Sequence, residues 1–235
     1  MGQTLGSVLS SPMAHFIFMV DGGTLFLLAG LFFNTAIYRK RGRQDDRFFS
    51  LMLLTLFPVT ASDLLGNAIL NTKIWGELPN AVNQMLYLMG LALFGYFWMR
   101  YLICRYQIKR DERFMKRIAE WLWAPIALIW LMIAAAFIGF VRTGFDAQEK
   151  PLAILFLIIF CAVSLLHILC MLINFQYAVA VRKDGVYVWL YLLPVLTMIN
   201  VPLLGGFSIN SLGLATMLVY MHMGRLNEAF FEEVD

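Results

Sequence analysis

The chain has 235 residues, of which 61% are hydrophobic and only 14% are charged, and its formal net charge is +3. So few charged side chains cannot cover the surface of a soluble globular protein. The apolar content also excludes a disordered chain, because disorder requires low hydrophobicity and high charge. The composition therefore predicts an integral membrane protein.

Seven apolar stretches are each long enough to cross a bilayer as a helix, which takes about 20 residues. In chain order they cover residues 13–38, 48–70, 81–104, 118–141, 151–181, 186–205 and 206–226. The last two are separated by Gly205-Gly206, which supplies a turn where the apolar run is too long for one crossing. We predict an all-α fold, a bundle of seven transmembrane helices surrounded by membrane lipids. The tryptophans near span ends are predicted at the membrane interfaces: Trp75, Trp98, Trp121, Trp123 and Trp189.

Basic residues lie mostly on one side of the predicted membrane. Of the 18 Lys and Arg residues, fifteen fall in the 39–47 loop, the segment 100–117, positions 182–183 and position 225, and three fall on the other side. Because cytoplasmic loops are enriched in Lys and Arg, this asymmetry predicts an extracellular N-terminus and a cytoplasmic C-terminus. The first apolar stretch has no basic residue before it, so we expect it to remain as a span and not to be cleaved as a signal peptide.

Two acidic residues fall in the outer half of predicted spans, Asp21 in the first and Asp63 in the second. Charged residues at membrane depth are costly and usually face the interior of a helix bundle. One interpretation is an outward-facing cavity with acidic walls, which binds a small ligand such as a cation, an amine or a proton. The residues predicted to line it are Asp21, Asp63, Asn67, Gln84, Asn200 and Asn210. The alternative is that these groups only form hydrogen bonds between helices.

Motifs of catalysis and metal binding are missing from the sequence. There is no P-loop, GxSxG or HExxH, and the His, Cys and acidic residues lack the spacing of metal ligands. A retinal protein would need a lysine in the last span, and no lysine follows Lys183. We therefore predict no catalytic residue, no metal, no cofactor and no nucleic-acid partner. His167, in the fifth stretch, is predicted to be a buried hydrogen-bonding residue.

The last apolar stretch continues without proline beyond Arg225, and we expect one helix to about Glu232. Leu226 and Phe230 are four residues apart, so they can pack against a partner helix, most simply the same helix of a second subunit. This predicts a homodimer through the C-terminal helix, with residues 1–226 as a seven-helix domain and residues 227–235 as the start of a cytoplasmic signalling helix. The alternative is a short tail on the membrane surface.

Several segments together carry a family resemblance. They are RKRGRQDDRFFSLMLL, SDLLGNAI, NQMLYLMGLALFGYFWMRYL, GVYVWLYLLPVLTMIN and SINSLGLATMLVYMHMGRLNEAFFEEVD. In pattern the chain resembles the N-terminal membrane regions of multi-pass bacterial signalling proteins that carry a GGDEF (diguanylate cyclase) domain. The resemblance implies a sensory input module in the bacterial cytoplasmic membrane that controls synthesis of cyclic di-GMP by a cyclase dimer. This chain has no GGDEF motif, so the cyclase would be attached or a partner, and similar inputs also precede histidine kinases.

Three functions are therefore compared. The first is a sensor that passes a signal through the C-terminal helix. The second is a small transporter or channel with Asp21 and Asp63 on an ion or proton path. The third is a structural subunit that binds partners through the basic 39–47 and 105–117 loops. A transporter predicts polar residues in both halves of the bundle, and by sequence the inner half is poor in them.

Overall fold

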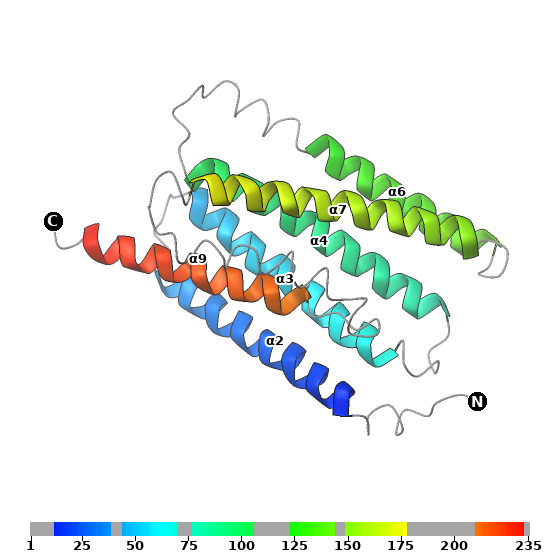
Figure 1. The fold of residues 1–235 in the computed structure, drawn as a ribbon, viewed down its shortest axis with the longest axis horizontal. Helices are drawn as coiled ribbons and strands as arrows, with labels where there is room; N and C mark the ends of the chain where they lie inside the picture. The colour runs from blue at the N-terminus through cyan, green and yellow to red at the C-terminus, as the bar shows by residue number, and fades with distance from the viewer. Residues whose placement is uncertain are drawn as a thin grey trace.

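A computed structural model describes six parts of the chain, and all six are helices (Figure 1). They are α2 (Pro12–Tyr38), α3 (Gln44–Ile69), α4 (Glu77–Arg105), α6 (Trp123–Thr143), α7 (Glu149–Tyr177) and α9 (Asn210–Glu232). Each helix end lies within six residues of the end predicted for its span. The predicted sixth span, 186–205, lies outside the described residues.

The helices run side by side in an elongated bundle (Figure 1). The main contacts of α3 are with α4 and α2, while α7 packs against α4 and α6. The C-terminal helix α9 returns to the beginning of the bundle and packs against α2 and α3. As a result, α9 touches helices that precede it by more than a hundred residues in the chain.

Among the six described helices, three are long and apolar enough to cross a membrane, judged by length and composition. The candidate spans are Phe18–Ile37, Gln44–Gly66 and Val82–Arg105. Two shorter apolar segments, Ile126–Gly139 and Ile158–Leu172, lie in α6 and α7. Large apolar side chains stand on the outside of the bundle, where Phe26 is 82% exposed and Leu131 is 67% exposed. Many large apolar side chains on the exterior are typical of a membrane protein.

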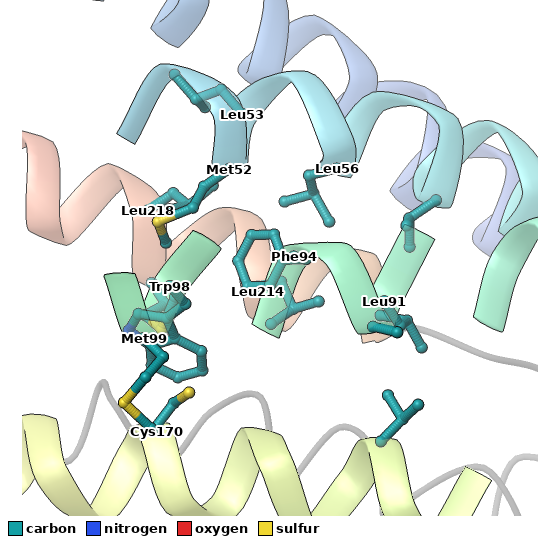
Figure 2. Packing of buried hydrophobic residues seen from close by; sticks show 14 of the residues in the cluster. Met52, Leu53, Leu56, Leu91, Phe94, Trp98, Met99, Cys170, Leu214 and Leu218 are labelled. Carbon is teal, nitrogen blue, oxygen red and sulfur yellow. The ribbon is translucent and has the colours of Figure 1, made fainter. Parts of the chain in front are cut away.

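The core lies where α3, α4, α7 and α9 meet. Figure 2 shows Phe94 and Trp98 of α4 in its middle, with Leu56 of α3 on one side and Cys170 of α7 on the other. Trp98 is fully buried. This corrects its predicted place at a membrane interface, because its ring packs edge-on against Phe94 at 6.1 Å between centroids.

Two glycines let α4 approach its neighbours closely. A Cβ added at Gly90 would overlap Cγ2 of Val59 on α3. A Cβ added at Gly95 would lie 2.9 Å from Cδ2 of Leu166 on α7. Small residues at such points allow membrane helices to pack with their backbones close together, and van der Waals packing is a main source of helix association there.

Candidate functional site

Both predicted acidic residues face the interior of the bundle. Asp21 of α2 is 0% exposed and Asp63 of α3 is 5% exposed. Their burial agrees with the expectation that a carboxylate at membrane depth avoids lipid. Each also takes part in polar or electrostatic interactions with its surroundings.

The start of α9 connects Asp21 to a second polar group. Ser211 Oγ donates a hydrogen bond to Asp21 Oδ1 at 3.3 Å, which joins α9 to α2. The neighbouring residue Asn210 donates from Nδ2 to Tyr87 Oη at 2.8 Å, which joins α9 to α4. The first turn of a helix carries partial positive charge, so the carboxylate of Asp21 is favourably placed beside it.

A third hydrogen bond joins α3 and α4 next to Asp63. Asn83 donates from Nδ2 to the backbone oxygen of Ser62 at 2.8 Å. Asn83 and Tyr87 are four residues apart and so share one face of α4. We name this set of neighbouring polar residues the outer polar layer, because the sequence predicts Asp21 and Asp63 in the outer half of their spans; its members are Asp21, Ser62, Asp63, Asn83, Tyr87, Asn210 and Ser211.

The structure brings together some of the residues predicted to line the cavity and leaves others undescribed. Asp21 and Asn210 are in the outer polar layer, linked through the first turn of α9. Gln84 is half-buried on α4. The side chain of Asn67 and the whole of Asn200 lie outside what the structure describes. A ligand cavity at this layer therefore stays a prediction.

Sequence reasoning missed Tyr87 and Ser211 as members of the layer. Neither stands out in the sequence, since Tyr87 is one of nine tyrosines and Ser211 lies in the first turn of a mostly apolar helix. The four-residue spacing of Asn83 and Tyr87 on one helix face is a signal that could have indicated Tyr87.

A second polar cluster lies where α3 begins. Arg225 of α9 forms a buried ion pair with Asp46 of α3. Beside it, Arg105 of α4 approaches Asp45, with 3.4 Å between Nη1 and Oδ2. The four side chains of these pairs are between 5% and 12% exposed. We call these four residues the charged latch, because they tie the ends of α4 and α9 to the first turn of α3.

The ring of Phe49 packs against Arg225 of the charged latch. The guanidinium of Arg225 lies 4.4 Å from the centroid of the Phe49 ring, a cation–π distance. The His222 ring stacks on the same phenyl ring at 5.9 Å between centroids, and its Nε2 lies 2.7 Å from Oδ1 of Asn34 on α2. This end of α9 is therefore held by α2 and α3 together.

Arg225, predicted on the signalling helix that continues the last span, is buried in the charged latch because α9 returns beside α3. Buried polar residues therefore also lie at this end of the bundle, at Asp45, Asp46 and His222. The sequence predicted an inner half poor in polar residues, and Asp45 and Asp46 precede the span predicted from residue 48. The prediction that the last helix continues to about Glu232 is confirmed, because α9 ends at Glu232.

His167 has a packing role in the α4–α7 contact. It is 0% exposed, and its Nδ1 lies 2.8 Å from the backbone oxygen of Val163. Its ring stacks on Phe94 at 5.9 Å with the two planes 1° apart. The prediction of a buried hydrogen-bonding histidine is confirmed. Within the six described helices, no group of three His, Cys, Asp or Glu side chains could hold a metal ion.

Comparison with protein-family models, with curated proteins and with solved structures found no match to this chain.

Proposed function

We propose that the chain is a sensory input module of seven transmembrane helices in a bacterial cytoplasmic membrane. In this proposal the N-terminus is outside, the C-terminus is in the cytoplasm, and α9 carries the signal to an output domain. The observation that carries the proposal is that α9 contacts its neighbours through polar groups at two separate heights along the bundle. Within the outer polar layer, Asn210 and Ser211 bind Tyr87 and Asp21, and further along α9 His222 and Arg225 bind Asn34 and Asp46.

The physical basis is the stiffness of a helix. From Ser211 to Arg225 the helix extends over about 21 Å at roughly 1.5 Å per residue. A ligand can shift a conformational equilibrium only by binding its two states with different affinity. A cation or amine that binds Asp21 would compete with Ser211 for the carboxylate, so it would favour a displaced α9. That displacement would reach the charged latch through the helix.

The output is proposed to be a diguanylate cyclase, attached or a separate partner. The proposal rests on the resemblance described above and on the helical continuation of α9 to Glu232. Leu226 and Phe230 would join two copies through this continuation and so align the two cyclase domains.

Topology is tested by labelling single cysteines in intact cells with a membrane-impermeant maleimide. We expect a cysteine at Asp146 to be modified and a cysteine at Gln44 to be protected, because the basic 39–47 and 105–117 segments are proposed to face the cytoplasm. Gln44 is exposed, so protection there would not result from burial within the chain. Permeabilised cells are the control and should label both positions. Modification of Gln44 with protection of Asp146 would contradict the proposal.

The signalling role of α9 is tested by fusing a diguanylate cyclase domain after Asp235. One to four residues are then inserted at Asn227. Each inserted residue rotates the following helix by about 100°. We expect cyclase activity to rise and fall with this rotation, and a seven-residue insertion, which nearly restores the helical phase, to recover it. Activity indifferent to all insertions would rule out α9 as the output helix.

A proton or cation transporter is the second candidate, and one observation favours it. Buried polar residues lie at two heights along the bundle, as a transport path requires, from Asp21 in the outer polar layer to His222 next to the charged latch. Measuring ion flux into vesicles that contain the purified protein distinguishes the two functions. Ion flux that is lost in Asp21→Asn and Asp63→Asn variants would favour the transporter, and vesicles without flux would favour the sensor.

A further inference from the structure

One face of α2 is apolar and exposed along the full length of its candidate span. Seven of the exposed positions of α2 are spaced alternately by three and four residues: Phe16, Met19, Gly23, Phe26, Gly30, Phe33 and Ile37. The opposite face is buried with the same spacing, at Asp21, Thr24, Leu28, Leu31 and Thr35. The buried face accounts for the contacts of α2 with α3 and α9. We call the exposed set the α2 seam.

The α2 seam alternates large and small side chains. Phe26 is 82% exposed and Phe33 is 69% exposed, and Gly23 and Gly30 lie one helical turn before each of them. A Cβ added at either glycine would meet nothing within 4 Å, so no contact within the described chain requires glycine there. Glycine inside a helix costs about 1 kcal/mol relative to alanine. Contact with lipid tails does not explain a glycine at these positions, whereas the close approach of another helix does.

We propose that the α2 seam is the interface with a second, parallel copy of this chain. A spacing of three and four residues is the pattern with which two helices interlock side chains over their whole length. In a two-fold symmetric pair, Phe26 of one copy would fit against the space that Gly23 and Gly30 leave on the other. The same surface is then complementary to itself, as a two-fold interface requires. Two copies in one membrane also have the same orientation.

The size of the seam fits a specific dimer. Its five large side chains, Phe16, Met19, Phe26, Phe33 and Ile37, are between 56% and 82% exposed. At about 200 Å² for a side chain of this kind they present roughly 700 Å² per copy, close to the roughly 800 Å² per partner of a standard interface. No charged residue interrupts the seam. The inference depends on membrane insertion and does not require the proposed sensing role. Because α9 packs on the opposite face of α2, a pair joined by the seam is an alternative to the pair through Leu226 and Phe230.

The first test is disulfide cross-linking of the full chain in lipid membranes. Single cysteines are placed at Gly23, Phe26, Gly30 and Phe33 in a variant whose three native cysteines are alanine. We expect these positions to form dimers on oxidation, while Leu28, on the buried face, does not. Leu131 on α6 is the control for random collision, since it is 67% exposed on another helix. Cross-linking at Leu131 as efficient as at Phe26, or none at any seam position, would overturn the proposal.

The second test measures association without cysteines. In vesicles at a fixed protein-to-lipid ratio, energy transfer between labelled chains gives the dimer fraction. Replacing Gly23 and Gly30 together by leucine should weaken the dimer at least roughly tenfold, a change of about 1.4 kcal/mol. The matched control is Ala134→Leu on the exposed face of α6, which should leave the dimer unchanged. An unchanged dimer in the double variant would overturn the proposal. A monomeric protein in which residues 186–205 of the same chain cross-link to the seam would also overturn the proposal, because the seam would then be covered within one chain.

Discussion

Replacing Asp46 by alanine should lower the free energy of unfolding by about 3 kcal/mol, the lower end of the range for removing one partner of a buried ion pair. The side chain of Asp46 is 5% exposed and that of Arg225 is 12% exposed, so water does little to replace the lost carboxylate. Arg225 would keep its position over Phe49, but a cation–π contact offsets only part of the loss. The measurement is unfolding in mixed micelles with increasing SDS, followed by circular dichroism.

Two further variants separate the ion pair from the surrounding packing. Arg47→Ala changes an exposed residue in the same helical turn, and we expect it to alter stability by less than about 0.5 kcal/mol. Combining Asp46→Leu with Arg225→Met should be less harmful than either single substitution, because no charge is then left buried alone. Effects that simply add in the double variant would show that the two residues do not act as a pair.

Replacing Gly90 by alanine should destabilise the fold by about 2 kcal/mol, a typical cost of overpacking a core. The new methyl group would overlap Cγ2 of Val59, which is 0% exposed. Valine has little rotamer freedom in a helix, so it cannot turn away, and α3 and α4 must move apart. The effect would exceed the roughly 1 kcal/mol that alanine gains over glycine in helix propensity.

The compensating variant for Gly90→Ala is Val59→Ala. It removes the overlapping carbon, so the double variant should be more stable than Gly90→Ala alone in the same SDS titration. The matched control is Gly22→Ala on α2, where an added Cβ meets nothing within 4 Å and we expect no loss of stability. A Gly90→Ala protein as stable as the unchanged chain would show that α3 and α4 are not in the close contact described.

The helices themselves were largely predictable, because apolar length is a local property of the sequence. The first predicted span, 13–38, corresponds to Pro12–Tyr38, and the helix predicted to about Glu232 ends there. The burial of Asp21 and Asp63 was also predictable, since a carboxylate facing lipid is costly wherever the remaining helices lie. For Trp98 the same local reasoning failed. Position near a span end does not say whether a ring faces lipid or a neighbouring helix.

The amino-acid sequence by itself determined that this chain forms long apolar helices with acidic groups turned inward. Only the tertiary structure decided which polar groups meet. Ser211 and Asp21 are 190 residues apart in the chain, His222 and Asn34 are 188 apart, and Arg225 and Asp46 are 179 apart. Helix periodicity defines faces within one helix, but it contains no information about which distant helix packs on each face. The return of α9 to α2 and α3 therefore added contacts at both polar levels, and it made Arg225 half of a buried ion pair.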